Sequence, residues 1–293
     1  MKRKSKIEQA VLIVIFIVLC SLVVMPFVLL LGVSLSNEQD VATYGYQFIP
    51  KNIDFSAYKY IFKNPTSILN AYKVTAIFSV VSMVLAVFLQ SLIAYALSWG
   101  KMRGKSVISF MLYFTMLFSG GLVPTYILNT QYLHLDDTIW IYIIPGLISP
   151  WNVFMMRTFF KGLPYEIYES AIMDGASEYR IYAQMVVPLS KPIFATLMLF
   201  TFLGKWNDWN TSLLYINDSE LFSLQYLLQK IMSDMTILQN AETSGANMLS
   251  LAEIPTETVR MAMAMVVAGP ALLVFPFFQK YFVKGITVGS VKG

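Results

Sequence analysis

The chain has 293 residues, of which 57% are apolar and only 13% are charged. Its mean hydropathy of +0.61 is far above that of an average soluble domain, which excludes a soluble enzyme or binding module and indicates a protein dissolved in lipid. The formal net charge of +4 is modest, and no basic stripe interleaved with aromatic residues indicates nucleic-acid binding.

Six stretches are long and apolar enough to cross a membrane, since one helical span needs about 20 residues. Each is apolar nearly all round, which favours helices over the alternating strands of a barrel. The stretches cover residues 10–33, 71–98, 107–127, 139–160, 192–214 and 262–282. The sequence therefore predicts an all-α integral membrane protein with six transmembrane helices, in a single domain over residues 1–293.

The first stretch follows four basic residues, Lys2, Arg3, Lys4 and Lys6, as a signal peptide would. Its apolar run exceeds the roughly 7 to 15 residues of a signal peptide, and no small-residue cleavage site stands out. We therefore expect this stretch to be retained as a span.

Basic residues predict the orientation, because cytoplasmic loops hold an excess of Lys and Arg. With the N-terminus inside, the cytoplasmic segments hold most of the 21 basic residues. These are Lys2, Arg3, Lys4, Lys6, Lys101, Arg103, Lys105, Arg157, Lys161, Arg180, Lys191, Lys280, Lys284 and Lys292. We therefore expect both termini in the cytoplasm.

Cys20 and His134 are the only residues of their kinds. A single cysteine excludes an internal disulfide and a cysteine-based metal cluster. A single histidine in a short outer loop lacks the partners of a metal site, so we expect it to be solvated. We accordingly expect no metal and no cofactor in this chain.

Proline and glycine interrupt several of the stretches, at Pro26, Gly120, Gly121, Pro124, Pro145, Pro150, Pro270 and Pro276. Such breaks are tolerated where neighbouring helices or cavity water satisfy the freed backbone groups, and they favour a transporter over a simple anchor. A packing kink is an equally good interpretation at any one position.

Two outer segments, residues 34–70 and 215–258, are too polar to span the membrane. The second has apolar residues at spacings that predict an amphipathic helix, namely Leu221, Leu224, Leu227, Leu228 and Ile231. Neither segment has the character of an independent domain.

The predicted cytoplasmic loop over residues 161–191 is long and carries charges of both signs, which is uncommon unless a loop is functional. Its pattern predicts two short helices. Pro164 suits the first turn of a helix, Gly175 a helix end and Ser177 the N-cap of the second helix. Pro188 then interrupts the pattern before the next span.

This loop resembles the EAA motif that defines the permeases of ATP-binding-cassette (ABC) importers. The motif has Glu, two alanines, a glycine six positions after the Glu and a proline near its end. Here Glu169, Ser170, Ala171, Gly175 and Pro188 stand in those places, so that serine replaces the first alanine. The resemblance implies a coupling helix that sits in a cleft of a cytoplasmic ATPase.

By this resemblance, residues 161–191 form a coupling loop that passes the closing of the ATPase to the spans. Glu169 is then expected to make a charged contact, Ala171 and Gly175 a close approach, and Ile181 the apolar side of the joint. The full set of expected coupling residues is Glu169, Ser170, Ala171, Asp174, Gly175, Ala176, Ile181 and Pro188. The alternative is a loop capped only for its own stability.

The resemblance to the carbohydrate-uptake, maltose-type branch of these permeases covers nearly the whole chain. Residues 279–293 are similar to the ending of that branch, and the resemblance implies that Gly289, Val291 and Gly293 reach toward the ATPase. A frayed terminus is the alternative.

The fifth stretch holds a polar run of possible pathway residues, Lys205, Trp206, Asn207, Asp208 and Trp209. Ionisable residues at membrane depth indicate function, and the run is similar to a pattern in sugar permeases. Lys205 and Asp208 are three apart, so on one continuous helix they would face each other as a neutralised pair. Snorkelling of Lys205 and an interfacial tryptophan belt are the alternatives, and Lys205 is compatible with an acidic sugar.

The resemblance implies a second homologous permease, an ATPase dimer, an extracellular solute-binding protein and a sugar or oligosaccharide substrate, all at a bacterial cell membrane. Because the chain has no P-loop signature, we expect the partner ATPase to bind ATP and Mg²⁺. An ion-coupled secondary transporter or channel remains the rival hypothesis, but it gives no reason for the coupling loop. An intramembrane zinc protease is a further alternative, but this chain lacks the paired histidines that such an enzyme needs to bind zinc.

Overall fold

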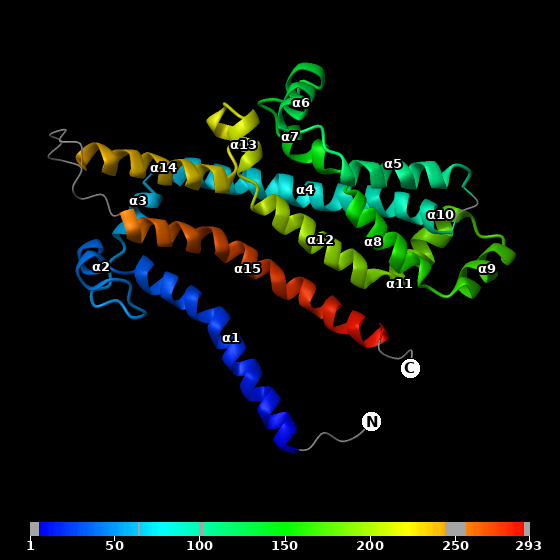
Figure 1. Ribbon diagram of the computed structural model, residues 1–293, viewed down its shortest axis with the longest axis horizontal. Helices are drawn as coiled ribbons and strands as arrows, with labels where there is room; N and C mark the ends of the chain where they lie inside the picture. The colour runs from blue at the N-terminus through cyan, green and yellow to red at the C-terminus, as the bar shows by residue number, and fades with distance from the viewer. Residues whose placement is uncertain (1–5, 64, 100–101, 244–255, 290–293) are drawn as a thin grey trace. The chain divides into compact units, whose positions relative to one another are not determined.

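All regular secondary structure is helical in the residues that the computed structural model describes, 6–63, 65–99, 102–243 and 256–289 (Figure 1). The exception is an isolated antiparallel bridge between Ser36 and Ile53. The all-α class is confirmed. The elements are α1 (Lys6–Ser34), α2 (Glu38–Tyr44), α3 (Ser56–Ile61), α4 (Pro65–Ser98), α5 (Lys105–Leu117), α6 (Leu122–Ile127), a π-helical turn (Leu128–Tyr132), α7 (Trp140–Ile143), a 3-10 turn (Ile144–Gly146), α8 (Pro150–Lys161), α9 (Tyr165–Met173), α10 (Glu178–Ile181), a π-helical turn (Tyr182–Val186), α11 (Val187–Leu189), α12 (Lys191–Trp206), α13 (Asn210–Tyr215), a 3-10 turn (Ser219–Leu221), α14 (Leu224–Thr243) and α15 (Thr256–Gly289).

Three of the described helices are long and apolar enough to cross a membrane alone, over Glu8–Ser34, Pro65–Ser98 and Glu257–Gln279. Two further pairs meet these criteria only together. Lys105–Leu117 and Leu122–Tyr132 meet at 117°, and Glu178–Leu189 and Lys191–Trp206 meet at 80°. By length and composition, the described residues therefore contain three spans, or up to five if each bent pair counts as one.

The stretch expected over 107–127 is not one straight helix. It leaves the helix after Leu117, and Gly121 adopts a φ of +88°, which glycine reaches without the steric penalty of a Cβ atom. Thr125 Oγ1 then donates to the carbonyl of Gly121 at 2.7 Å as α6 begins. The glycines at this point thus break the helix, as their position indicated.

The stretch over 139–160 is also interrupted. Pro145 has no N–H to donate to the carbonyl four residues before it, and the chain tightens there from α7 into a 3-10 turn. Pro150 then starts α8, a position that suits its fixed φ.

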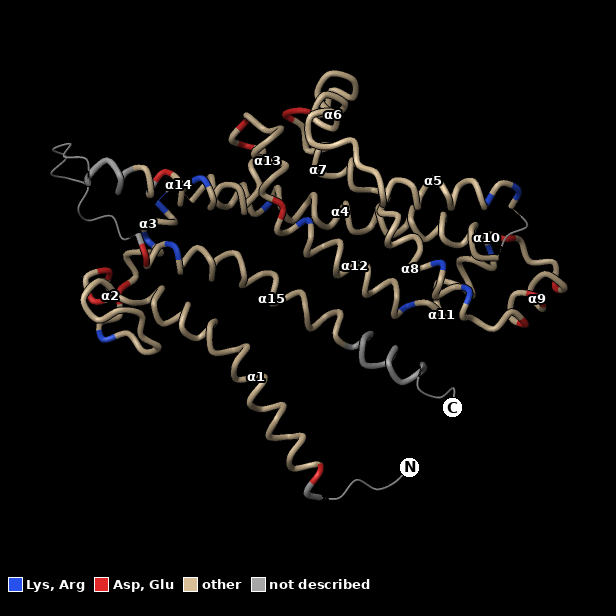
Figure 2. Tube along the Cα trace, in the orientation of Figure 1, with Lys and Arg blue, Asp and Glu red and all other residues tan. Residues whose placement is uncertain are grey.

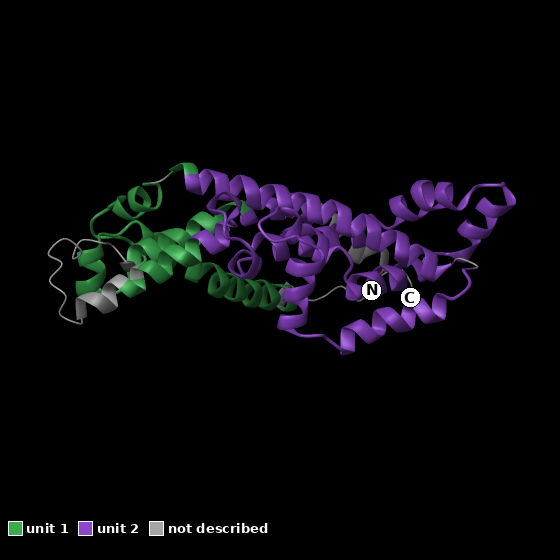
Figure 3. Cartoon of the chain, turned by 90° about the horizontal axis from the view of Figure 1, so that it is seen from above, with its two compact units in different colours: residues 1–66, 228–270 green, residues 67–227, 271–293 purple. Residues whose placement is uncertain are grey.

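The chain forms two compact units, coloured separately in Figure 3. One consists of residues 1–66 and 228–270, and the other of residues 67–227 and 271–293. The second unit holds the coupling loop, the polar run of the fifth stretch and two hydrophobic clusters.

In the first unit, Glu38 joins α2 to the start of α15. Its carboxylate accepts hydrogen bonds from the backbone N–H groups of Glu257 and Thr258, each at 2.9 Å, and from Thr258 Oγ1 at 2.6 Å. The first N–H groups of a helix have no partner within it, and negative charge is favourable there. A carboxylate from another helix therefore caps α15.

In the second unit, α4 runs through both hydrophobic clusters. In the first cluster, Phe78 stacks on Tyr142 of α7 with ring centroids 4.2 Å apart, and both side chains are buried. In the second cluster, the C-terminal half of α4 packs against α8, α9, α10 and α12. The buried members of that cluster are Val87, Ala94, Leu97, Val153, Met156, Phe160, Tyr168, Ala171, Ile181, Val186, Ile193 and Leu197.

The amphipathic helix expected in the outer segment 215–258 is present as α14. Leu224 and Leu228 lie on its buried face. The helix starts at Leu224, after a 3-10 turn that includes Leu221, so the expected pattern began one turn early.

Phe78→Ala should destabilise the protein by about 3 to 5 kcal/mol, because it removes a fully buried ring and the stacking contact of that ring with Tyr142. Thermal unfolding in a mild detergent checks this. Phe110→Ala is the matched control, since that ring is 65% exposed and its loss should change the midpoint little. Equal shifts for the two variants would contradict the packing described.

Candidate functional site

The coupling loop folds into the two helices that its sequence predicted. Asp174 is the C-cap of α9, and Gly175 follows with a φ of +72°. The N–H of Ala176 donates to the carbonyl of Ala171 at 3.0 Å, which closes the helix end. Ser177 then caps α10 by accepting from the N–H of Arg180 at 3.4 Å.

The end of the loop differs from the expectation. Pro188 lies within the short helix α11, which directly follows the π-helical turn Tyr182–Val186, and the chain turns at Ser190 instead. The resulting bend between the coupling loop and α12 is the 80° bend described above. Pro188 therefore precedes the turn rather than making it.

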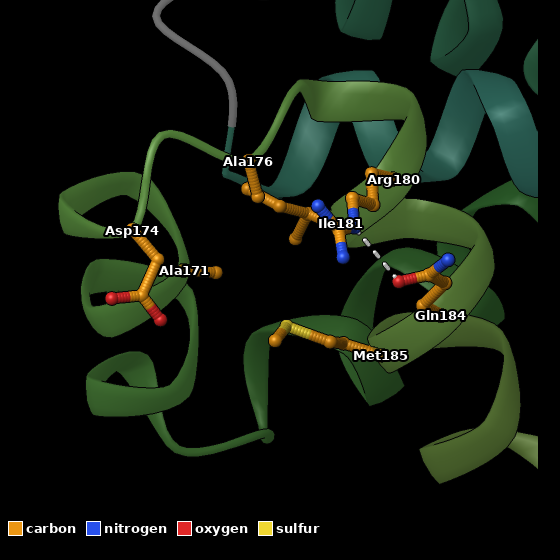
Figure 4. Close-up of a pocket in the computed structure, with 7 residues that line it drawn as sticks. All are labelled: Ala171, Asp174, Ala176, Arg180, Ile181, Gln184 and Met185. Atoms are coloured by element: carbon orange, nitrogen blue, oxygen red, sulfur yellow. Dashed lines mark hydrogen bonds between the residues drawn. The ribbon is translucent and has the colours of Figure 1, made fainter.

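Four of the expected coupling residues lie around one small pocket of about 130 Å³ (Figure 4). Ala171 and Ile181 are each 1% exposed and face the interior of this unit. The lining consists of Ala171, Asp174, Ala176, Arg180, Ile181, Gln184 and Met185. Arg180 Nε donates to Gln184 Oε1 at 3.0 Å across the turn of the helix.

The remaining coupling residues are exposed on this chain. Glu169, Ser170 and Pro188 point away from the core, and a Cβ atom added to Gly175 would meet nothing within 4 Å. The loop thus divides into an inner face, with Ala171 and Ile181, and an outer face that includes Glu169 and Gly175.

Sequence reasoning missed two large apolar side chains on the outer face. Met173 is 85% exposed and Tyr179 is 83% exposed, on either side of the turn at Gly175. Apolar residues that flank a glycine turn in a charged loop were the available signal. Exposed apolar side chains beside a glycine turn suit a contact with another protein.

Sequence reasoning also missed Glu178, the first residue of α10. Its carboxylate accepts hydrogen bonds from Tyr168 of α9 at 2.8 Å and from Tyr95 of α4 at 2.5 Å. Burial raises the pKa of Tyr168 to about 12, and the hydrogen bond to Glu178 adds to the shift. Tyr168 therefore remains a hydrogen-bond donor at neutral pH.

The polar run of the fifth stretch lies where a helix ends. α12 stops at Trp206, and Asp208 accepts from the N–H and hydroxyl of Thr211 at 3.0 and 2.7 Å as α13 begins. The expected Lys205–Asp208 pair on one helix is therefore wrong, because the helix is not continuous. No ion pair within 4.0 Å joins the two residues in the described part of the chain.

Lys205 instead satisfies a backbone group at another break. Its ammonium group donates to the carbonyl of Tyr142, near the end of α7. A cation at the end of a helix is favourable, because the last carbonyl groups carry partial negative charge. Lys205 thereby joins the end of α12 to the interruption between α7 and α8.

A buried hydrogen-bond network holds the segment that follows α12. The Tyr142 hydroxyl lies 2.5 Å from Ser212 Oγ, which is hydrogen-bonded to Ser223 Oγ at 3.0 Å. Ser223 Oγ donates to the carbonyl of Asp208 at 2.8 Å, and the N–H of Leu224 donates to Thr75 Oγ1 of α4 at 2.8 Å. The polar run is therefore fixed to α4 and α7.

The members of the run differ in access. Trp206 is 4% exposed and stacks on Phe202 with ring centroids 5.6 Å apart. Trp209 is 43% exposed. Asn207 is exposed, and its Oδ1 accepts from Gln225 of α14 at 3.0 Å. An amide and an indole thus face outward beside a buried indole.

Asp137 joins the loop before α7 to the turn after α13. Its Oδ1 accepts from the N–H groups of Asn217 and Asp218 at 2.5 and 2.9 Å, and its own N–H donates to the carbonyl of Tyr215 at 3.0 Å. The backbone hydrogen bonds from Asp218 and Asn217 hold the pKa of Asp137 below its ordinary value, because they stabilise the charged form. His134, in the same loop, is exposed, as expected.

A comparison with protein families identifies the class of this protein. The model of the family described as "Binding-protein-dependent transport system inner membrane component" matches residues 64–288. The chain belongs to this family. The resemblance to ABC importer permeases is thus confirmed, and the protein is a transport subunit of a bacterial membrane system that works with an ATPase and a substrate-binding protein.

Individual relatives match nearly the whole chain. Protein LplC of Bacillus subtilis is 36% identical over 93% of this chain and 90% of that protein. The polygalacturonan/rhamnogalacturonan transport system permease protein YtcP of the same organism is 36% identical over 92% of this chain and 93% of that protein. A solved bacterial ABC transporter involved in the import of the acidic polysaccharide alginate contains a similar chain, with 30% identity and a TM-score of 0.79 over 96% of this chain and 99% of that one.

Asp137→Asn should lower the midpoint of thermal unfolding at neutral pH, because the charged acceptor for two N–H groups is lost. The pKa of Asp137 is lower in the folded protein than its ordinary 3.8, so its contribution is complete above about pH 4 and disappears as the pH falls through the lowered pKa. The difference in midpoint between wild type and variant should therefore shrink on acidification.

Asp136→Asn is the control for this measurement, since it changes the same charge one residue away. Thermal unfolding of all three proteins between about pH 7 and pH 3 gives the comparison. A difference for Asp137→Asn that stays constant over this range would contradict the assigned role.

Proposed function

We propose that the chain is one of two transmembrane halves of a bacterial ABC importer for an acidic oligosaccharide, and that residues 161–191 couple it to the ATPase. The observation that carries the coupling role is the outer face of the loop. It combines exposed Glu169 and a glycine turn with the apolar side chains of Met173 and Tyr179. Exposure of apolar side chains to water is energetically unfavourable, and such a surface suits a cleft in a partner protein.

In the proposed topology a single multi-pass domain crosses the bacterial cell membrane six times, with both termini in the cytoplasm. The three long helices, the bent pair over Lys105–Leu117 and Leu122–Tyr132, and the stretch over 192–214 would supply five spans, and the interrupted stretch over 139–160 the sixth. Figure 2 supports the orientation, because Lys and Arg occur on α8, α10 and the starts of α5 and α12, all at the coupling-loop end of their unit. Cytoplasmic ends carry this excess.

The proposed assembly adds a second, homologous permease, an ATPase dimer that binds ATP and Mg²⁺, and an extracellular binding protein. We assign the contact with the ATPase to the exposed coupling residues and to the end of the chain. Gly289 is the last described residue of α15, and Val291 and Gly293 lie outside the described residues. Ala171 and Ile181 would support the loop from within rather than contact the ATPase.

We place the substrate pathway beside the break between α12 and α13. Asn207 and Trp209 are exposed there, and an amide with an aromatic face suits a sugar ring, which offers hydroxyl groups and C–H patches together. Lys205, Trp206 and Asp208 would then position this segment. The acidic substrate class is supported by the names of two relatives, which refer to polygalacturonan and to alginate.

Purification of the tagged protein in mild detergent, with mass spectrometry of what stays bound, tests the class. We expect a P-loop ATPase and a second permease. A homo-oligomer without an ATPase, reproduced in several detergents, would favour the ion-coupled secondary transporter instead.

Uptake by the reconstituted complex, with ATP inside the vesicles and the binding protein outside, tests the substrate. We expect accumulation of trigalacturonate or of an alginate trisaccharide, and little of maltotriose. ATP-dependent uptake of the neutral trisaccharide alone would retain the importer and overturn the acidic class.

Gly175→Arg should leave the protein inserted and assembled but lower uptake per ATP hydrolysed, because the added side chain projects from the outer face of the loop. Gly175→Asn is the matched control, since Asn is the residue that best tolerates a positive φ after Gly and it adds little bulk. Transport and ATPase rates in vesicles give the ratio. Normal coupling in Gly175→Arg would exclude the outer face from the contact.

A further inference from the structure

α4 connects the two regions to which function has been assigned. It is a single helix of 34 residues in which the only proline stands first and no glycine occurs. Sharp bends in helices nearly always need such residues or an inserted group. Thr75 and Tyr95 lie 20 positions apart on it, which corresponds to about 30 Å along the axis. Both belong to the unit of residues 67–227 and 271–293.

At one end, the coupling loop is attached to α4 by Glu178. This carboxylate accepts from Tyr95 of α4 and Tyr168 of α9, so one side chain links both coupling helices to the span. Hydrogen bonds to an ionised acceptor are roughly twice as strong as neutral ones. We call Tyr95, Tyr168 and Glu178 the Glu178 joint.

Aromatic packing surrounds the Glu178 joint. Trp99, just after α4, lies with its ring centroid 5.1 Å from that of Tyr168. Tyr182 lies 5.4 Å from Tyr95 by the same measure, and its hydroxyl is 2.6 Å from Ser91 Oγ of α4. The loop therefore contacts α4 over about two turns of helix, through α9 and through the segment that follows α10.

At the other end, α4 holds the segment beside the proposed pathway. Thr75 accepts from the N–H of Leu224, and Phe78 stacks on Tyr142, whose hydroxyl enters the network with Ser212. The break between α12 and α13 is thus attached to the same continuous helix as the coupling loop.

We propose that Glu178 is a positioning residue for transport, which fixes the coupling loop to α4 so that α4 carries the movement of the loop to the α12–α13 break. This rests on the proposed coupling function. In this proposal the coupling loop moves α4, which is distant from it in sequence, as well as α8 and α12, which flank the loop in sequence. The joint moves as one body during the transport cycle.

Single hydroxyl deletions test the joint in vesicles that hold the whole complex, with the trisaccharide that the wild-type complex takes up. Tyr95→Phe and Tyr168→Phe each remove one hydrogen bond and keep the ring. We expect each to reduce uptake per ATP hydrolysed by about fivefold. Tyr113→Phe is the matched control, because Tyr113 is 53% exposed on α5 and outside the joint.

Substitution of Glu178 itself separates the roles of the two hydrogen bonds. Glu178→Ala should lose more coupling than either tyrosine variant, and the amide of Glu178→Gln, with a single acceptor oxygen, should restore part of it. In the background of Glu178→Ala, Tyr95→Phe should have no further effect, because its partner is already absent. A purely structural role would instead lower the amount of assembled complex and leave uptake per ATP unchanged.

A reversible cross-link tests whether the joint moves as one body. Tyr95→Cys and Glu178→Cys are combined with Cys20→Ser, which removes the only native cysteine of the chain. A bifunctional methanethiosulfonate reagent should restore uptake per ATP, and dithiothreitol should remove the gain. Tyr95→Cys alone with the same reagent controls for modification of partner subunits.

The outcomes are distinct. Coupled transport by Tyr95→Phe and Glu178→Ala, with a competent wild-type complex, would overturn the role of the joint. Loss of transport on cross-linking would overturn the one-body movement. Absence of ATP-dependent uptake by the wild-type complex would instead overturn the proposed function on which the inference rests.

Discussion

Lipid offers no hydrogen bonds to a backbone, and this constraint governs how the chain can depart from straight helices. Wherever a helix breaks at membrane depth, another part of the protein must satisfy the freed groups. In the proposed topology, Lys205 does so at the end of α7, by donating to the carbonyl of Tyr142. Ser223 does so at the start of α13, by donating to the carbonyl of Asp208. The breaks therefore come with their own buried polar partners.

These partners also give the breaks a fixed geometry. Tyr142, Ser212 and Ser223 are buried and hydrogen-bonded to one another, so the segment after α12 has little freedom to shift independently. Buried networks of this kind are costly when only partly satisfied and rigid when complete. A pathway built beside such a segment would be moved by its helices rather than deformed by its ligand.

Local rules predicted the local features of the chain. The positive φ of Gly175 and the cap at Ser177 depend on side chains within a few positions, and the sequence indicated both. The predicted pairing of Lys205 with Asp208 on one helix was wrong, because α12 ends at Trp206 and does not continue to Asp208. Its end is fixed by contacts with α4, α7 and α14, which no local pattern encodes.

Glu178 was missed for the same physical reason. Its partner Tyr95 lies 83 residues earlier in the chain, and a carboxylate at the start of a short helix is ordinary by itself. The outer face of the coupling loop was only half recognised. The charged and small residues followed from the motif, whereas Met173 and Tyr179 became notable once their exposure was known.

The exposed tip of the loop also bears on how much of this protein a cell can hold. In the proposed assembly, a copy that has not met its ATPase would present Met173 and Tyr179 to the cytoplasm, where chaperones and proteases bind accessible apolar segments. Association with the ATPase would cover both side chains, so that chaperones and proteases could no longer bind them. The steady-state amount of the permease is then expected to follow the supply of its partner, and subunit stoichiometry would be kept without separate regulation of its synthesis.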